Sequence, residues 1–411
     1  MFGTTKTRVI VDEKKIDEVL SRSVSAIYPN KELLKEKLFS GKQMRIYMGI
    51  DPTATYAHIG HATNYIVLKR LHNLGHKIII LIGDFTAMIG DPSDKNAERK
   101  RLSKEEVLGN LKTFKEQIGK IIDFKDKNNP VELRFNSEWL SKLTFEDGVE
   151  LASHFTVQQM IERDNFQKRI KENKPLYIHE FFYPLMQGYD SVALDVDMEV
   201  GGTDQTFNML AGRTLLKVYK NKEKFVITTT LLEHPVTKEK LMSKSLGTGV
   251  GLDEPPNQMF GKIMALPDEA LIQLFVDCTY LSMGEIDRIK KELETGENPK
   301  NIKIKLAREI AKIYHGEKAA TEAEKTFENT FSKREFPNDA QTLTVSKEEK
   351  IIDVLVNNKI VESKSEFRRL IEAGAISDYP DKKINNGNEI VGGKERKIKI
   401  GKKTFVIIKP N

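Results

Sequence analysis

Two histidines, His58 and His61, stand three residues apart where a predicted strand gives way to a predicted helix. The apolar run Arg45–Ile50 is typical of a buried strand, and Asp51-Pro52-Thr53 ends it. From Ile59 onward, apolar residues recur with a helical period. A helix N-terminus has unpaired N–H groups and a partial positive charge, which favour a bound phosphate. The spacing therefore predicts a phosphate-binding turn in which both imidazoles can donate to anionic oxygens.

A second polar stretch lies far downstream, at Met242-Ser243-Lys244-Ser245 in a glycine-, serine- and lysine-rich loop. A third, Gly90–Arg101, carries Asp91, Lys95 and Arg99. By itself, each of these patterns is also compatible with an ordinary helix cap or an exposed basic loop. A metal site at the histidines is disfavoured, because no third ligand stands nearby at a suitable spacing.

A predicted helix face with both polar and apolar residues is the next candidate for a ligand-binding site. Tyr183, Gln187 and Asp190 have the spacing i, i+4, i+7, which places them on one face of a helix. Large apolar residues surround them, so a small polar ligand held against an apolar helix explains the mixture better than a plain core stripe. Further on, Gly201-Gly202-Thr203-Asp204-Gln205 follows a short predicted strand. Thr203 is a candidate helix cap, and the position of this segment at a strand end favours contact with a ribose or a carboxylate.

These residues need a scaffold that gathers distant strand ends. Strands are predicted at 45–50, 78–82, 131–135, 198–200 and 225–229, separated by helices, while residues up to about Ser40 are predicted to be helical. Such alternation indicates a right-handed, parallel, doubly wound sheet whose ligand crevice lies at the carboxyl ends of its strands. Residues 112–174 are mostly helical in pattern and charged, which favours an insertion in that sheet.

Composition sets limits on the class of protein. The chain has 411 residues, of which 39% are hydrophobic and 31% charged, as expected for a globular protein of two or three domains. It lacks an apolar run of membrane-spanning length and a signal-peptide pattern, and its single cysteine excludes a disulfide framework. We therefore expect a cytoplasmic protein without a membrane partner or a structural metal.

Charge is concentrated at the end of the chain. The net charge is +6, and fifteen basic and ten acidic residues lie from Ser346 onward, so +5 of the total belongs to this tail. A basic tail on a near-neutral body indicates a polyanionic partner. Within it, Ser363 is predicted to cap a helix that carries Lys364, Arg368 and Arg369, although a solvated helix face would look the same.

Taken together, these motifs resemble those of bacterial tyrosyl-tRNA synthetases, which belong to class I of the aminoacyl-tRNA synthetases. The resemblance covers nearly the whole chain and rests on segments 47–61, 90–99, 183–190, 201–205 and 242–245, in family order. It implies a Rossmann-like catalytic domain at 1–236 with the insertion at about 112–174, a signature loop and α-helical anticodon-binding domain at 237–335, and a small α+β RNA-binding domain at 346–411. It also implies a homodimer that uses L-tyrosine, ATP with Mg²⁺, and tRNA(Tyr).

The resemblance assigns roles residue by residue. Thr53, His58, His61, Lys95, Arg99, Lys244 and Gln205 would act in adenylate chemistry. Contacts to ATP would further come from Gly60, Gly202, Asp204, Met242 and Ser243. Tyrosine would be held by Tyr47 and Asp190 at its phenol, and by Asp91, Tyr183 and Gln187 at its ammonium, with Asp51 nearby. Binding of tRNA would fall to Lys364, Arg368 and Arg369.

Three positions depart from the family pattern. Met48 stands where many relatives have a small polar residue, and Leu241 replaces the first lysine of the signature loop, with Lys240 beside it. Glu199 stands where other relatives have glutamine.

Three alternative functions stay open on the sequence. A tryptophanyl-type synthetase shares the sheet and both signatures, but indole has one donor and no acceptor to match Tyr47 with Asp190. A non-catalytic RNA-binding protein could keep the same scaffold, although His58, His61 and Lys244 are all present. An adenylyltransferase of the same fold would not need a basic tail.

Overall fold

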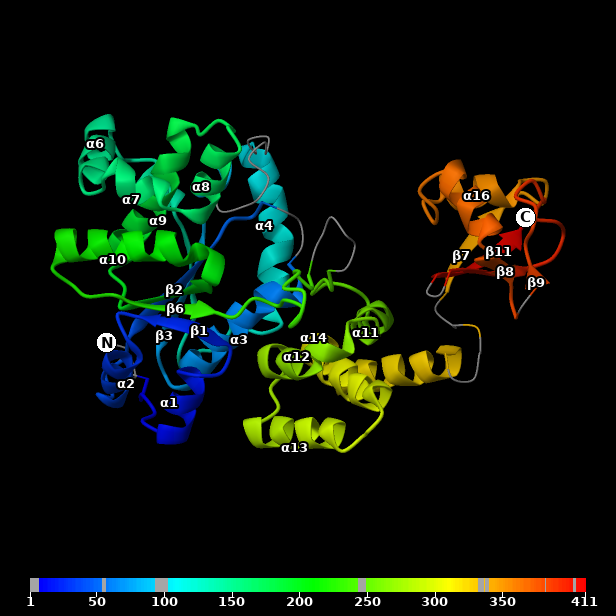
Figure 1. The fold of residues 1–411 in the computed structure, drawn as a ribbon, viewed down its shortest axis with the longest axis horizontal. Helices are drawn as coiled ribbons and strands as arrows, with labels where there is room; N and C mark the ends of the chain where they lie inside the picture. Colours follow the sequence, from blue (N-terminus) through cyan, green and yellow to red (C-terminus); the bar gives the residue numbers. More distant parts are fainter. Residues whose placement is uncertain are drawn as a thin grey trace. The chain divides into compact units, whose positions relative to one another are not determined.

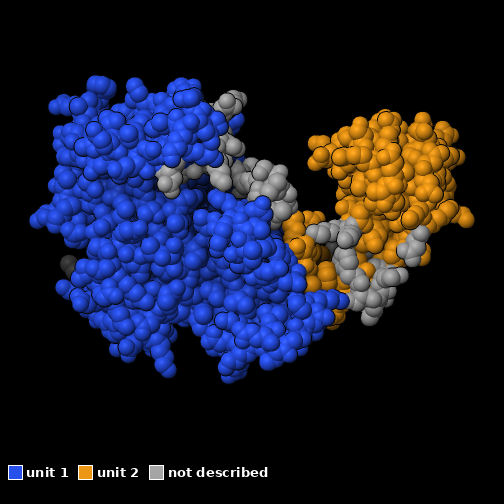
Figure 2. Space-filling view, viewed as in Figure 1, with its two compact units in different colours: residues 1–254, 266–306 blue, residues 255–265, 307–411 orange. Residues whose placement is uncertain are grey.

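The structure is a computed structural model that describes residues 7–53, 57–92, 103–242, 249–331, 336, 340–380, 382–401 and 404–411. It divides into two compact units, which are coloured separately in Figure 2. The first comprises Met1–Glu254 and Leu266–Leu306, and the second comprises Pro255–Ala265 and Ala307–Asn411. The three domain boundaries expected from the sequence stay a prediction.

A six-stranded sheet, formed by described residues, is the centre of the first unit, with the strand order β1-β6-β5-β2-β3-β4. Its strands are β1 (Val24–Tyr28), β2 (Arg45–Ile50), β3 (Lys77–Ile82), β4 (Glu132–Phe135), β5 (Met198–Gly202) and β6 (Phe225–Thr229). Strands β2 to β6 pair in parallel. The central strand β2 pairs with β3 on one side and with β5 on the other, so the strand order reverses there. The expected α/β class with a doubly wound parallel sheet is confirmed.

The first unit also contains helices, several of which pack around this sheet (Figure 1). The helices of this unit are α1 (Glu13–Val19), α2 (Lys31–Phe39), α3 (Ile59–Asn73), α4 (Lys104–Gly119), α5 (Ser137–Leu140), α6 (Phe145–Ser153), α7 (Val157–Ile161), α8 (Asp164–Lys171), α9 (Ile178–Leu194), α10 (Thr206–Lys220), α12 (Leu271–Cys278) and α13 (Met283–Glu294), with the short 3₁₀ turns η1 (Thr86–Met88), η2 (Thr203–Gln205) and η3 (Asp268–Ala270). Helices α9 and α10 pack along each other, while α12 and α13 lie farther from the sheet. Strand β4, which lies within the expected insertion, belongs to the main sheet.

One prediction about the N-terminal region was wrong. Residues up to Ser40 were expected to be helical throughout, but β1 separates α1 from α2 and pairs antiparallel with β6. Ser23 has a φ of 62°, which turns the chain out of α1 before the strand begins. A five-residue edge strand has too short a pattern to be distinguished from helix by periodicity, so its partner strand decided its conformation.

The second unit contains a small mixed sheet with the order β7-β11-β10-β8-β9 among its described residues. These strands are β7 (Gln341–Val345), β8 (Ile376–Asp378), β9 (Lys382–Lys383), β10 (Arg396–Ile400) and β11 (Thr404–Pro410), and α15 (Ile351–Asn357) and α16 (Lys364–Glu372) pack with them around Phe367 and Ile398. Helix α11 (Pro256–Met264) also belongs to this unit. Helix α14 (Pro299–Phe331) leaves helical geometry at Gly316, where φ is 82°, and then resumes.

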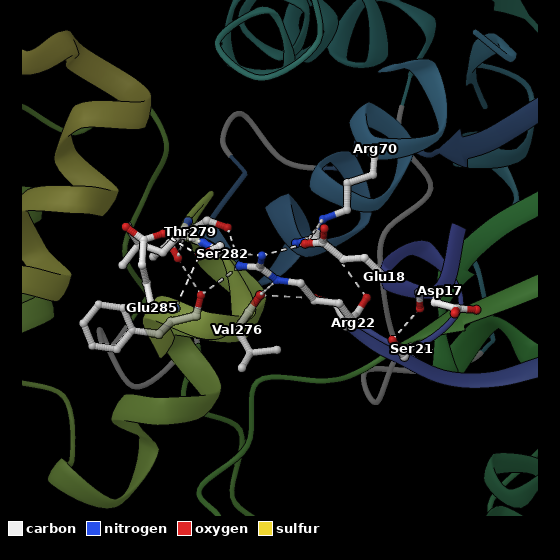
Figure 3. A network of polar contacts seen from close by, with 12 residues as sticks. Asp17, Glu18, Ser21, Arg22, Arg70, Val276, Thr279, Ser282 and Glu285 are labelled. Atoms are coloured by element: carbon white, nitrogen blue, oxygen red, sulfur yellow. Dashed lines mark hydrogen bonds and ion pairs between the residues drawn. The ribbon is translucent and has the colours of Figure 1, made fainter. Parts of the chain in front are cut away.

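Arg22, shown in Figure 3, fastens the N-terminal helices to α12. Its guanidinium donates to the carbonyls of Val276 and Thr279, both at 2.9 Å, and of Leu281 at 2.6 Å, and it forms an ion pair with Glu18 at 2.8 Å. The last carbonyls of a helix lack partners within the helix, so this buried cation satisfies groups that would otherwise be left without hydrogen bonds.

We expect Arg22→Met to lower the free energy of unfolding by about 3 kcal/mol or more, because several buried carbonyls lose a charged donor at once. Lys35→Met is the matched control, because the Lys35–Asp17 ion pair is exposed to solvent and contributes little to stability. Thermal unfolding of both variants measures the difference. Equal midpoints for the two variants would contradict the anchoring role of Arg22.

Candidate active site

The candidate residues meet at the carboxyl ends of β2, β3 and β5, the edge predicted for the ligand crevice. Tyr47 and Asp51 lie on and just after β2, Asp91 follows β3 and η1, and Asp204 follows β5. Tyr183, Gln187 and Asp190 come from α9, and their shared face is confirmed. Lys95, Arg99, Ser243 and Lys244 lie outside the described residues.

The helix that the sequence predicts after the histidine turn is confirmed, and α3 begins at Ile59. His58 is the N-cap of this helix, with an extended backbone, and its N–H donates to His61 Nδ1 at 3.3 Å. The two imidazoles stack with their centroids 3.7 Å apart. A Cβ on Gly60 would lie 3.0 Å from His58 Nδ1 and 3.4 Å from Met242 Cγ, so the absence of a side chain keeps this surface flat.

The segment that follows the predicted signature loop lies beside the start of α3. Beyond the loop, Val250 and Leu252 pair with the backbone of the phosphate turn: Ile59 N donates to Val250 O at 3.0 Å, and Leu252 N donates to Ala57 O at 2.9 Å. Helix α4 holds both segments, because Gln117 Oε1 accepts from Ala57 N at 2.6 Å and Lys120 Nζ donates to Leu252 O at 2.7 Å. These last two contacts were not foreseen from the sequence.

Asp51 is a partly buried carboxylate just after the carboxyl end of β2. It accepts hydrogen bonds from the hydroxyls of Thr86 at 2.7 Å and Tyr183 at 2.9 Å. Burial, together with the nearby carboxylates Asp91 and Asp84, raises the pKa of Asp51 to about 7, although its two hydroxyl partners oppose that shift. Asp51 can therefore titrate near neutral pH.

Asp91 lies between a neutral donor and a cation. Gln205 Nε2 donates to Asp91 Oδ2 at 2.6 Å, and the buried guanidinium of Arg163 lies 3.7 Å from Asp91 Oδ1. Arg163 also lies over the rings of Phe166 and Phe207. The structure thus brings together Asp91 and Gln205, two candidate residues named by the family resemblance, and it adds Arg163 to them.

At the other end of the α9 face, Asp190 is held by residues that the sequence analysis missed. Trp139 Nε1 donates to Asp190 Oδ1 at 2.7 Å, and Asn136 Nδ2 lies 3.3 Å from Asp190 Oδ2. Burial raises the pKa of Asp190 well above its usual range, while these two donors oppose the shift. Asn136 directly follows β4, so its place at a strand end was a usable signal, as was Trp139, the single tryptophan of the chain.

Tyr47 is fully buried beside this carboxylate. Its hydroxyl lies 2.9 Å from Ser191 Oγ, and burial raises the pKa of Tyr47, with further contributions from Glu199 and Asp190. Glu199 in turn accepts from Gln187 Nε2 at 3.0 Å and forms an ion pair with the buried Lys224. Ser191 and Lys224 were absent from the predicted site.

The turn after β5 departs in one detail from the prediction. Thr203 was expected to cap the following helix, but it lies inside η2, and its hydroxyl donates to Thr229 O at 2.8 Å. Gly201 packs closely against the buried Met209, because a Cβ on Gly201 would lie 2.9 Å from Met209 Sδ. Asp204 is exposed and Gln205 half-buried at this edge, while Thr53 is half-buried after β2.

The basic residues predicted to bind RNA lie in the second unit. Lys364 forms an ion pair with Asp353 at 2.6 Å, and Arg368 and Arg369 are exposed on α16, which Ser363 caps as predicted. Among the described residues, no cluster of three or more histidine, cysteine or acidic side chains could hold a metal ion. None of the described helices has the length and apolar character needed to cross a membrane.

Comparison with known proteins places these features in a family. The model of the family described as "tRNA synthetases class I (W and Y)" matches residues 40–332. The chain is 46% identical to a tyrosine–tRNA ligase of Carboxydothermus hydrogenoformans, over 97% of this chain and 98% of that protein. It is 45% identical to tyrosine–tRNA ligase 2 of Clostridium acetobutylicum, over 96% and 98% of the two chains.

Solved structures support the fold. A C-terminally truncated mitochondrial tyrosyl-tRNA synthetase of Aspergillus nidulans superposes with a TM-score of 0.66 at 22% identity, covering 78% of this chain and 95% of that one. The tyrosyl-tRNA synthetase of Archaeoglobus fulgidus, solved with L-tyrosine, superposes with a TM-score of 0.57 at 18% identity. The match covers 76% of this chain and 99% of that one.

The pKa of Asp51 predicts a pH dependence of stability. Because this pKa is higher in the folded protein than in the unfolded chain, the folded state binds more protons between about pH 4 and pH 7, and stability falls as pH rises through that window. Between pH 5 and pH 7 the loss amounts to about 2 kcal/mol. We expect Asp51→Asn to abolish this part of the dependence in thermal unfolding. An identical pH dependence in both proteins would show that Asp51 titrates normally.

Proposed function

Because the chain belongs to the class I tRNA synthetases (W and Y), we propose that it is a tyrosine–tRNA ligase. A carboxylate oxygen of L-tyrosine attacks the α-phosphorus of ATP, the bond to the bridging oxygen breaks, and pyrophosphate leaves. A ribose hydroxyl of the terminal adenosine of tRNA(Tyr) then attacks the carbonyl carbon of tyrosyl-adenylate, and AMP leaves. The near-full-length identity of 46% to a tyrosine–tRNA ligase carries this proposal.

The amino-acid pocket lies along α9. Asp190, held by Trp139 and Asn136, accepts a hydrogen bond from the phenol of the substrate, with the Tyr47 hydroxyl nearby. Phenylalanine would leave this buried carboxylate without its partner, a defect that can discriminate by roughly 10⁴–10⁵. A tryptophanyl-type enzyme is the alternative, and the hydroxyl of Tyr47 argues against it because an indole cannot accept its proton.

Hydrogen-bond acceptors of the protein bind the α-ammonium group of the substrate. Asp91 and the amide oxygen of Gln187 bind the α-ammonium, Tyr183 adds its hydroxyl, and Asp51 holds Tyr183 in place. Gln205, whose amide donates to Asp91, orients the reacting carboxylate. Binding both ends of the amino acid fixes its carboxylate for attack without a covalent intermediate on the protein.

ATP lies over the phosphate turn. His58, His61 and Thr53 face its phosphates at the start of α3, Gly60, Gly202 and Met242 shape the nucleotide surface, and Asp204 binds the ribose. By family resemblance, Lys244, Ser243, Lys95 and Arg99 act on the departing pyrophosphate, whose developing charge needs such donors in the transition state. Mg²⁺ would be carried by the phosphate oxygens of ATP and would neutralise part of their charge.

We expect tyrosine alone, among the twenty amino acids, to support rapid exchange of labelled pyrophosphate into ATP. Asp190→Ala should weaken tyrosine activation by a factor of about ten or more, because a hydrogen bond to a charged group contributes roughly 1.5–3 kcal/mol. Equal exchange with tryptophan or phenylalanine would refute the assignment, and an unchanged Asp190→Ala variant would place the phenol elsewhere.

A homodimer is proposed from an exposed apolar surface. Phe145 and Val149 on α6 are 88% and 55% exposed, and Ile178 at the start of α9 is 78% exposed. Phe182, one turn further along α9, lies against Gly148 of α6, so the two helices present one patch. Contiguous apolar surface of this kind marks an interface between proteins.

Ile178→Asp is expected to shift the protein towards monomers in sedimentation or light scattering, because a charge at the centre of an apolar interface must be desolvated on association. Val218→Asp is the control, since Val218 is also exposed but lies on α10. A protein whose mass is the same in wild type and the Ile178 variant would contradict this interface.

The tail is proposed to bind tRNA through Lys364, Arg368 and Arg369. Deleting the chain from about Asp339 should leave pyrophosphate exchange nearly intact but severely weaken charging, because phosphate contacts supply most of the affinity for RNA. The double variant Arg368→Ala/Arg369→Ala should reduce the slope of affinity against salt by about two. If the truncated enzyme charges tRNA at the full rate, the tail is not the tRNA anchor.

A further inference from the structure

A buried ion pair lies directly behind the amino-acid face of α9. Lys224 and Glu199 have side chains that are 0% and 2% exposed, and the ammonium of Lys224 contacts the Glu199 carboxylate. Burying two charges is unfavourable unless each is well paired, so such a pair needs a reason beyond stability. None of the roles assigned above uses Lys224.

The Lys224 ammonium has a second polar partner, and a glycine on α10 leaves the space that it occupies. Lys224 Nζ donates to Ser191 Oγ at 2.8 Å, and it lies 5.6 Å from the centroid of the Tyr47 ring. The space comes from α10, where a Cβ on Gly212 would lie 2.6 Å from Ser191 Oγ and closer still to the ammonium. Glycine at this position is therefore required by the buried lysine.

The contact between Glu199 and Gln187 has a fixed direction. Glu199 Oε1 accepts from Gln187 Nε2 at 3.0 Å, and an ionised carboxylate can only accept. The amide nitrogen of Gln187 must therefore face Glu199, which turns the amide oxygen to the other side. Lys224 donates to the other oxygen of the same carboxylate, so it supports Glu199 as the acceptor in the contact with Gln187.

We propose that Lys224 and Glu199 are a positioning pair that fixes the amide of Gln187 with its oxygen towards the substrate ammonium. An ammonium group has donors only, so a reversed amide would present N–H groups to N–H groups. The inference rests on the proposed function, and it adds a determinant of amino-group recognition that does not touch the substrate.

Glu199→Gln is the direct test, because Lys224 remains. Lys224 would take the oxygen of the new amide, whose nitrogen would then face Gln187 and force the amide of Gln187 to reverse. We expect the KM for tyrosine in pyrophosphate exchange to rise about tenfold or more, with little change in kcat. Competitive inhibition by 3-(4-hydroxyphenyl)propionate, which lacks the amino group, should be unchanged, whereas inhibition by tyramine should weaken.

Rescue distinguishes positioning from damage to the core. In Glu199→Gln/Lys224→Met the new amide is free to offer its oxygen to Gln187, so the KM for tyrosine should return to within about threefold of the wild-type value. Lys222→Met is the matched control: Lys222 lies two residues away and pairs with Asp195 and Asp197, so it should not rescue the Glu199→Gln variant.

The outcomes separate the two proposals. If the wild-type protein shows no tyrosine-dependent exchange, the proposed function fails. If the wild-type protein shows exchange but Glu199→Gln keeps the wild-type KM for tyrosine, the positioning pair is refuted. It is also refuted if Glu199→Gln weakens inhibition by 3-(4-hydroxyphenyl)propionate by as large a factor as it raises the KM for tyrosine. Rescue by Lys222→Met would equally refute it. Should the double variant not fold, the contrast between tyramine and the propionate in Glu199→Gln alone decides.

Discussion

The backbone pairing of β2 with both β3 and β5 is the constraint on which the site depends. Because the strand order reverses at β2, the connections from neighbouring strands leave in opposite directions and open a crevice at the carboxyl ends. Asp51, Asp91 and Asp204 are separated by up to 153 residues in the chain, yet each follows a strand that ends at this edge. Parallel pairing alone brings them together.

The crevice then has to hold several carboxylates in a buried setting. Each of these carboxylates has donors of a different kind. Asp51 accepts from two hydroxyls, Asp190 from an indole and an amide, and Glu199 from an ammonium group. Burial raises the pKa of Asp51 and of Asp190, and the donors that contact these two carboxyl groups oppose the shift. The pocket is thus polar where a ligand must be recognised, while the sheet beneath it is apolar.

A second constraint links the start of α3 with the segment that follows the signature loop. The backbone of Val250–Leu252 pairs with Ala57–Ile59, and α4 contacts both through Gln117 and Lys120. These bonds involve main-chain atoms on at least one side, so they depend on the position of the segments more than on side-chain identity. The chain that follows the signature loop is therefore held next to the phosphate turn.

The sequence by itself determined the parallel strands, the start of α3 at the histidines, the shared face of Tyr183, Gln187 and Asp190, and the capped helix α16. Each of these follows from local periodicity or capping chemistry, which acts within a few residues. The family resemblance extended this to a class and to named roles.

Tertiary structure alone decided the rest. The edge strand β1 took its conformation from β6, and Thr203 turned its hydroxyl to Thr229 instead of capping a helix. Trp139, Asn136, Arg163 and Lys224 joined the site from distant segments, because their contacts depend on which strands are neighbours and on a buried volume left open by Gly212. A buried charge is stable only beside its partner, and that partner is chosen by packing in three dimensions, which local sequence does not encode.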